Sequence, residues 1–220
     1  MQLYTYFRSS AAYRVRIALN LKGLRYEALP VHLVKGGGEQ KQDAYRAVNP
    51  NALLPALAVD DAVITQSLAI IEYLEETHPG VPLLPPGPPG RARARELALL
   101  VACDIHPLNN LRVLRYLVQE LKIDEAAKNA WYRHWVMEGL AAFEQHLAQP
   151  QHGEAGAAPG QFCVGDAPSI ADCCLVPQLY NARRFDIDLS PYPLIEAIDA
   201  NCARLPAFQA AHPSQQPDAE

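Results

Sequence analysis

Residues 7–19 read "FRSSAAYRVRIAL", and this stretch decides how the first part of the chain folds. It joins an apolar segment, Leu3 to Phe7, which has the composition of a strand, to a helical pattern from Ala11 to Leu21. Ser9 and Ser10 stand between them, where the first N–H groups of the helix have no partner within the helix. Such a helix end carries partial positive charge, so it favours an anion.

The residues of this junction leave two interpretations open. Ser10 could simply cap its helix, or the helix end could hold the thiolate or carboxylate of a ligand. A redox protein would place a cysteine here, and the stretch contains none. A sulfur in this position would have to come from a ligand.

Composition excludes several classes of function. The 220 residues include 19 basic and 24 acidic side chains, a net charge of −5, so no overall field draws the protein to nucleic acid or to acidic membranes. Five cysteines, two of them adjacent, make poor disulfide pairs and predict a reduced, cytoplasmic protein. We find no signal peptide and no apolar run long enough to span a bilayer.

A proline-rich stretch at 77–90, "THPGVPLLPPGPPG", divides the chain, because six prolines and three glycines prevent a helix or central strand. Before it, we expect strands at 3–7, 25–33, 55–59 and 62–65, and helices at 11–21, 40–47 and 68–77. After it, we expect helices at 91–119 (interrupted near Pro107), 125–147, 170–182 and 194–205, a loose loop at 149–161 and a frayed polar tail after His212. These patterns predict an α/β domain at 1–80, a linker at 81–90 and an all-helical domain at 91–220.

Two further motifs of the first half suggest ligand contacts. In "NPNALLPAL", 49–57, a cis Pro55 would turn the Leu54 main chain outward to pair with a peptide-like ligand, although prolines at strand starts often only punctuate the chain. In "TQSLAII", 65–71, Ser67 is expected to cap a second helix, preceded by the amide of Gln66. That helix end is either an ordinary cap or a second anion site.

The second half carries a polar patch and an arginine pair. In "CDIHPLNNLRVLR", 103–115, we expect Pro107 to break the helix and to present His106, Asn109, Asn110 and Arg112 together. A metal or thiol–imidazole site at Cys103 and His106 is disfavoured, because no further ligand is near in sequence.

Other polar residues of the chain have structural interpretations. Arg183 and Arg184, at the end of the apolar helix, are either solvated charges or a carboxylate clamp. Ser169 and Asp172 form the capping box of an apolar helix, and Arg14 and Arg16 are expected to form structural ion pairs.

Together these motifs resemble a known family. "SSxxYRVRIALNLKG", "NPNALLPAL", "QSLAIIEYLEE", the proline linker, "ADCCLVPQ" and "RRFDIDLSPYPLI" occur in the order and spacing of the zeta-class glutathione transferases, from about Leu3 to Pro217. The resemblance implies a thioredoxin-like N-terminal domain followed by an all-α C-terminal domain, a homodimer, and glutathione as cofactor. One departure is Ala11, which stands where the zeta pattern usually has a cysteine.

The resemblance also implies where glutathione binds. Its cysteine would lie at Ser9 and Ser10, its backbone at Leu54 before Pro55, and its γ-glutamyl end at Gln66 and Ser67.

Within the class, the chain is similar to the maleylacetoacetate isomerases of tyrosine, phenylalanine and aromatic-compound degradation. This similarity implies glutathione-dependent cis–trans isomerisation of a maleyl keto-diacid, with no metal. The implied catalytic residues are Ser9, Ser10, Arg8, Arg112 and Arg184, and His106 and Asn110 add polar support at the cofactor. Two alternatives remain: a maleylpyruvate isomerase of the same mechanism, and a non-catalytic protein that binds glutathione or another ligand.

Overall fold

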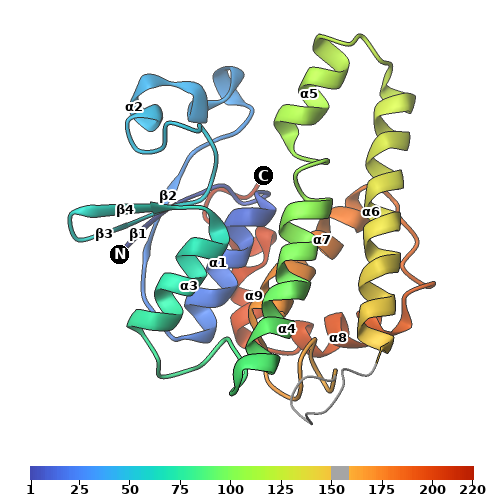
Figure 1. The fold of residues 1–220 in the computed structure, drawn as a ribbon. Coiled ribbons are helices and arrows are strands. Elements are labelled where there is room, and N and C mark those ends of the chain that lie inside the picture. Colours follow the sequence, from blue (N-terminus) through green and yellow to red (C-terminus); the bar gives the residue numbers. More distant parts are fainter. Residues whose placement is uncertain (150–158) are drawn as a thin grey trace. The chain divides into compact units, whose positions relative to one another are not determined.

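The computed structural model describes residues 1–149 and 159–220, which form two compact units (Figure 1). The first unit is Met1–Leu83 with Ala203–Glu220, and the second is Leu84–Cys202. Residues 203–220 therefore group with the first unit, whereas the sequence pattern places them at the end of the second domain. The expected loop at 149–161 lies mostly outside the described residues.

The first unit contains the expected alternation of strands and helices. Its elements are β1 (Gln2–Thr5), α1 (Ser10–Leu21), β2 (Glu27–Pro30), α2 (Asp43–Arg46), β3 (Ala56–Val59), β4 (Ala62–Thr65), α3 (Ser67–Thr77) and α9 (Pro206–Ala211), with 3₁₀ turns at Lys35–Gly37, Glu39–Lys41 and Pro213–Gln215. The helix predicted at 40–47 is instead a 3₁₀ turn followed by the single turn α2.

The four strands form one sheet in the order β2-β1-β3-β4. β1 pairs parallel with β2 and antiparallel with β3, and β3 pairs antiparallel with β4. Within this unit α2 lies on one side of the sheet and α1 and α3 on the other (Figure 1). α1 packs against both α3 and α9, so the C-terminal segment completes the helical layer.

β1 ends at Thr5, two residues before the end that we predicted from the sequence. The reason is Arg16, whose guanidinium is completely buried and donates hydrogen bonds to the carbonyls of Tyr6 and Phe7 and to the Thr5 hydroxyl. Because these carbonyls bind Arg16, the chain leaves the sheet after Thr5. Arg16 also donates to Ala211 O, which ties α9 to the same loop.

The second unit is helical. Its elements are α4 (Pro88–Leu99), a π-helical turn (Leu100–Ile105), α5 (Leu111–Gln119), α6 (Glu125–Ala148), α7 (Ile170–Arg184) and α8 (Pro193–Ala203). The predicted interruption near Pro107 lies between the π-helical turn and α5. In the described residues, no helix is long and apolar enough to cross a membrane.

α4 begins inside the predicted linker, so our exclusion of a helix up to residue 90 was wrong. Pro88 and Pro89 occupy its first turn, after Gly87 at a φ of 80°. Proline costs little there, because the first N–H groups of a helix have no intrahelical partner.

α7 has the predicted capping box. Asp172 accepts hydrogen bonds from Ser169 N and Oγ at 2.7 and 2.8 Å, and from Cys163 N at 2.9 Å. Asp172 is completely buried. Burial raises the pKa of this carboxyl above 3.8, and the hydrogen bonds from Cys163 and Ser169 oppose the shift. The Asp172 side chain thus joins the segment at Cys163 to the start of α7.

Candidate functional site

Three motifs of the first unit follow from one end of the sheet. In the register of the strands, Tyr4 pairs with Ala56, and Ala56 pairs with Thr65. Because β3 runs antiparallel to β1 and β4, the end of β1, the start of β3 and the end of β4 lie in one row. The stretches 7–10, 54–55 and 66–67 therefore lie next to one another at the same end of the strands.

The β1–α1 junction distinguishes the two serines. Ser9 is the N-cap of α1, and its hydroxyl accepts a hydrogen bond from Ala12 N at 3.2 Å. Ser10 is the first helical residue and is buried, whereas Ser9 is partly exposed. The cap that we considered for Ser10 is therefore made by Ser9. The first turn of α1 contains no acidic residue, so its positive end is available to an anion.

Arg8 precedes the capping serine and is exposed. Its guanidinium carbon lies 4.8 Å from the centroid of the Phe7 ring. The charge of Arg8 is thus held beside the positive end of α1.

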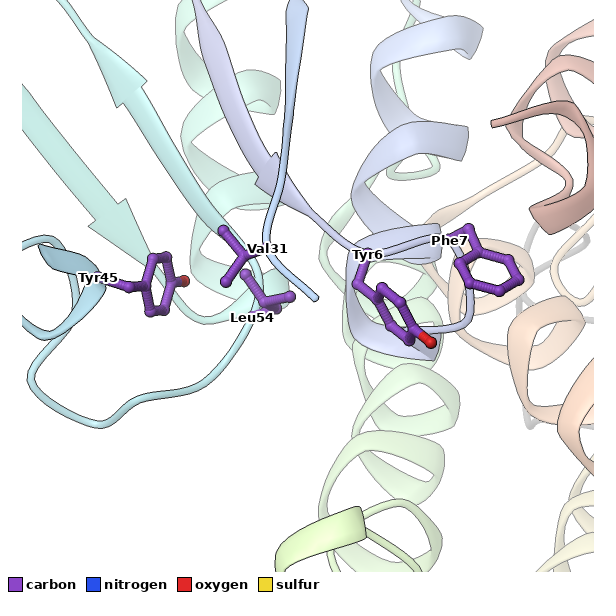
Figure 2. Close-up of a cluster of buried hydrophobic side chains, with 5 residues drawn as sticks. All are labelled: Tyr6, Phe7, Val31, Tyr45 and Leu54. Carbon is purple, nitrogen blue, oxygen red and sulfur yellow. The ribbon is translucent and has the colours of Figure 1, made fainter. Parts of the chain in front are cut away.

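An apolar cluster packs at this junction (Figure 2). It contains Tyr6, Phe7, Val31, Tyr45 and Leu54, which come from the loop after β1, the end of β2, α2 and the segment before β3. This packing fixes the β1–α1 junction relative to the start of β3.

Tyr45 of the cluster also holds the main chain before β3. Tyr45 donates its hydroxyl to Leu53 O at 2.7 Å, and Asn49 Nδ2 donates to the same oxygen at 2.7 Å. Burial raises the pKa of Tyr45, so it remains a protonated donor.

The bond between Leu54 and Pro55 is cis, as predicted. Leu54 lies just outside β3, and its main-chain N–H and C=O make no hydrogen bond with another described residue. Both groups can therefore pair with an extended ligand in the manner of an added strand.

The N-terminus of α3 differs from our prediction. Gln66 is the N-cap, at a φ of 70°, and makes no side-chain capping hydrogen bond. Ser67, which we expected to cap the helix, is its first residue, and its Oγ accepts a hydrogen bond from Arg14 Nη1 at 3.2 Å. The first turn has no acidic residue, so this helix end also favours an anion.

Arg14 does not form the expected ion pair. It is buried, and no carboxylate among the described residues pairs with it. The sequence did contain a signal: two arginines stand within the apolar run "AAYRVRIAL", which indicates that Arg14 and Arg16 are buried with specific partners. The sequence did not show which residues those partners are.

In the second unit, the polar patch forms around the end of the π-helical turn. Asn110 is the N-cap of α5, where its Oδ1 accepts from Arg112 N at 3.1 Å. Asn110 Nδ2 lies 3.5 Å from His106 Nε2, and the Arg112 side chain is exposed. The structure thus brings together three of the residues that we predicted. Asn109 is instead buried, with its Nδ2 3.4 Å from Tyr132 O.

The two arginines at the end of α7 have different partners. Arg183 Nη2 lies 2.6 Å from Asp199 Oδ2 on α8, and the Arg183 side chain is half exposed. Arg184 is exposed, and its Nη1 is 3.4 Å from Asn181 Oδ1 of the same helix. Burial raises the pKa of Tyr132 to about 12, and the charge of Arg184 opposes this shift. Arg184 therefore has a guanidinium available to a carboxylate.

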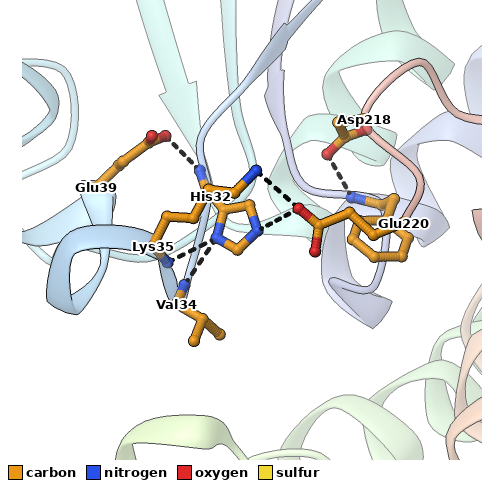
Figure 3. A network of polar contacts seen from close by, with 7 residues as sticks. His32, Val34, Lys35, Glu39, Asp218 and Glu220 are labelled. Carbon is orange, nitrogen blue, oxygen red and sulfur yellow. Dashed lines mark hydrogen bonds and ion pairs between the residues drawn. The ribbon is translucent and has the colours of Figure 1, made fainter.

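The C-terminal tail makes contacts with the first unit that the sequence pattern did not predict (Figure 3). Asp218 Oδ2 accepts a hydrogen bond from Phe7 N at 3.0 Å. Glu220 Oε1 lies 2.8 Å from Lys35 Nζ and 3.3 Å from His32 Nε2. The hydrogen bond from Lys35 lowers the pKa of Glu220. The expected fraying is therefore wrong, because the main chain beyond β1 offers a donor that the tail carboxylate accepts.

Metal-binding side chains are not gathered anywhere in the described part of the chain: no group of three or more His, Cys, Asp or Glu residues could hold an ion. All five cysteines are free thiols, and Cys103 alone is exposed.

Comparison with known proteins agrees with this geometry. The family models for the N-terminal and C-terminal domains of glutathione S-transferase match residues 3–82 and 125–210. A solved maleyl pyruvate isomerase, described as a bacterial glutathione S-transferase of the zeta class, is 50% identical and covers 100% of both chains with a TM-score of 0.93. This chain belongs to the zeta class of glutathione transferases.

Two further relatives of this zeta-class transferase are informative. The maleylacetoacetate isomerase of Pseudomonas aeruginosa is 50% identical over 219 residues, which cover 99% of this chain and 98% of the relative. A maleylacetoacetate isomerase from Methylobacterium extorquens, solved with bound malonate and glutathione, is 43% identical and covers 100% of both chains with a TM-score of 0.92. The zeta-class fold therefore extends over the whole chain, as a thioredoxin-like domain followed by a helical domain.

Proposed function

We propose that this zeta-class transferase is a glutathione-dependent cis–trans isomerase that converts maleylacetoacetate to fumarylacetoacetate. The observation that carries the proposal is the row of three motifs at one end of the strands. Each matches one part of glutathione: α1 with its serines suits the thiolate, Leu54 suits the peptide main chain, and α3 suits a carboxylate. Full-length similarity to the maleylacetoacetate isomerase of Pseudomonas aeruginosa supports the substrate.

The residues present fit glutathione on local grounds. Leu54 lies before Pro55 with both main-chain hydrogen-bonding groups unused by other described residues. The γ-glutamyl end would be bound by Gln66 and Ser67, where the first N–H groups of α3 lack a side-chain cap. A peptide with a thiolate at α1, an extended main chain at Leu54 and a carboxylate at α3 is the ligand that such an arrangement favours.

When bound, glutathione supplies a thiolate that adds reversibly to the substrate double bond, which permits rotation from cis to trans before the thiolate leaves. The hydroxyls of Ser9 and Ser10 and the positive end of α1 stabilise negative charge at the sulfur. Ala11 offers no thiol, so no cysteine of this junction takes part.

The two substrate carboxylates require cations, because the chain has a net charge of −5. We assign this role to Arg8, Arg112 and Arg184, whose side chains are exposed. His106 and Asn110 add polar support. The Methylobacterium extorquens relative was solved with bound malonate, a dicarboxylate, and glutathione, which supports the assignment.

Maleylpyruvate, a shorter keto-diacid that isomerises by the same chemistry, is the second candidate substrate. The 50% identity to a maleyl pyruvate isomerase favours it as strongly as the similarity above favours maleylacetoacetate.

One experiment tests the reaction and separates the substrates. Each cis acid is offered with and without glutathione, while trans product and total thiol are followed. We expect trans product only with glutathione, a constant thiol titre, and a higher kcat/KM for maleylacetoacetate. A thiol titre that falls with turnover would indicate conjugation, and binding of glutathione without turnover would indicate a non-catalytic protein.

We also propose that the protein is a cytoplasmic homodimer. The class implies the dimer, and the five free thiols are typical of a reducing compartment. Light scattering at micromolar concentration tests the dimer, and a measured mass equal to that of one chain would contradict it.

A further inference from the structure

We propose that Arg14 is the positioning residue of the carboxylate subsite at the N-terminus of α3. Its buried guanidinium holds the Ser67 hydroxyl and places a positive charge beneath the helix end that receives the γ-glutamyl carboxylate of glutathione. This inference rests on the proposed function, because it assumes that glutathione binds with that end at Gln66 and Ser67.

The environment of Arg14 is the observation behind the proposal. Its side chain is almost completely buried, and Nη1 donates to Ser67 Oγ at 3.2 Å. Nε and Nη2 are also buried and have no hydrogen-bond partner among the described residues. No described carboxylate neutralises the charge. An unpaired buried charge is costly, so its presence calls for an anion nearby.

The end of α3 provides the place for that anion. Gln66 does not cap the helix with its side chain, and the first turn contains no acidic residue. The first N–H groups of α3 and the Arg14 guanidinium both contribute positive charge, and the first turn of α3 holds no acidic side chain that would balance it. A bound carboxylate would neutralise both.

The hydrogen bond to Ser67 explains how Arg14 can act without touching the ligand. A serine hydroxyl has two acceptor lone pairs and one O–H donor. Because Arg14 occupies a lone pair, the O–H of Ser67 remains available to donate to a carboxylate oxygen. A cationic donor also polarises the hydroxyl and strengthens the bond that it donates. Arg14 thus orients Ser67 and increases its donor strength.

The test measures whether Arg14 acts on the γ-glutamyl carboxylate in particular. Dissociation constants are measured by calorimetry for glutathione and for 4-aminobutyryl-cysteinyl-glycine, which lacks only that carboxylate. Four proteins are compared: wild type, Arg14→Met, Ser67→Ala and the double variant. We expect Arg14→Met to weaken glutathione binding about tenfold or more, in line with loss of a charge-assisted contact, and to leave analogue binding nearly unchanged.

The double variant tests the route through Ser67. If Arg14 acts through this hydroxyl, the losses of glutathione affinity in the two single variants are not additive. The double variant then binds glutathione only slightly less tightly than whichever single variant binds it less tightly. Additive losses would show that Arg14 and Ser67 act separately and would overturn the positioning role.

A matched control is Arg93→Met, which removes another buried arginine, one that forms an ion pair with Glu96. We expect it to leave the preference for glutathione over the analogue unchanged. Thermal unfolding checks that each variant is folded. If Arg14→Met does not fold, Arg14→Lys replaces it. The ammonium keeps the charge but not the planar donor group, so we expect a smaller loss of preference.

The outcomes separate this inference from the proposed function. Wild type that binds neither ligand would contradict the function. Wild type that prefers glutathione, with an Arg14→Met or Arg14→Lys variant that keeps the full preference, would overturn the inference alone. Equal weakening of both ligands would assign Arg14 a structural role only.

Discussion

Ser9 and Ser10 are adjacent in sequence but have different environments. Ser9 is partly exposed and caps α1, whereas Ser10 is buried in the first turn. We therefore expect Ser9→Ala to have the larger effect on bound glutathione and to raise the pKa of its thiol by roughly one to two units, the equivalent of a charge-assisted hydrogen bond. Ser10→Ala should raise it less. The thiolate absorbance of the complex, followed against pH, measures both shifts.

Ser9→Ala also removes a helix cap, which costs about 1 kcal/mol of stability. A thermal unfolding curve separates this loss from the effect on the thiol. If neither serine variant changes the thiol pKa, the thiolate lies elsewhere.

The arginines at the end of α7 provide a comparison between neighbours. If Arg184 binds a substrate carboxylate, Arg184→Ala should lower kcat/KM by the factor that corresponds to a loss of on the order of 2–4 kcal/mol in transition-state binding, and should leave the glutathione Kd unchanged. Arg184→Lys should restore only part, because an ammonium lacks the planar donor pair. Steady-state kinetics and calorimetry on the same preparations measure the two quantities.

Arg183→Ala is the matched control for Arg184→Ala. It breaks the ion pair with Asp199, in which the arginine side chain is half exposed. We expect a stability loss of about 1 kcal/mol or less and unchanged kcat/KM. An Arg183→Ala enzyme that loses activity, beside an active Arg184→Ala enzyme, would exchange the two roles.

At the scale of elements, periodicity predicted most of the helices and strands, but it missed α9 and did not predict where the elements end. β1 stops early because a buried arginine from α1 binds the next two carbonyls, a contact across the fold. α4 starts early because two prolines are tolerated in a first turn. The Ser169–Asp172 box was predictable because its bonds lie within four residues of sequence.

Asp172 has a consequence for the stability of α7. It accepts from Ser169 N and from Cys163 N through different oxygens, so the amide of Asp172→Asn would place a donor against one of these N–H groups. We expect a loss of about 1–3 kcal/mol in the free energy of unfolding, measured by urea denaturation. Ser169→Ala, which keeps the carboxylate, should cost less. A loss in Asp172→Asn no larger than in Ser169→Ala would contradict this account.

The pH dependence of Asp172 has a definite sign. Burial raises its pKa above 3.8 in the folded state, so the folded protein binds the proton more tightly than the unfolded chain. Its contribution is therefore fully present below 3.8 and is lost as pH rises through the raised pKa. The stability gap between wild type and Asp172→Asn should be widest at low pH and should narrow as pH rises. A gap that widens with pH would contradict the raised pKa.

For the whole molecule, the main difference from expectation is the tail. We predicted fraying from the polar composition of the tail. Composition indicates that a segment tolerates exposure to water, but it does not show which residues the segment contacts. The partner of Asp218 is Phe7, which lies 211 residues away in sequence. The motifs that we assign to glutathione are local and could be picked out from the sequence, whereas Arg14, Arg16 and Asp218 act through contacts that only the folded chain brings together.

The tail contact yields the last prediction. Asp218 accepts the N–H of Phe7, the residue before Arg8 and Ser9, so it holds the junction that we assign to the thiolate. In Asp218→Ala this N–H loses its acceptor, and we expect its hydrogen exchange to become faster, as a native-state exchange experiment resolved at the Phe7 amide would measure. The glutathione thiol pKa should rise in the same variant, because the helix end and the Ser9 hydroxyl are less firmly placed.

Glu220→Gln is the control for the tail. Glu220 pairs with the side chains of Lys35 and His32 rather than with the main chain of Phe7, and its side chain is half exposed. This change should leave exchange at Phe7 close to wild type. Its own pairing depends on pH: because the folded pKa of Glu220 is lowered, the pairing is present above 4.5 and is lost as pH falls through the lowered value. Unchanged exchange at Phe7 in Asp218→Ala would mean that Arg16 alone fixes the loop, through the carbonyls of Tyr6 and Phe7.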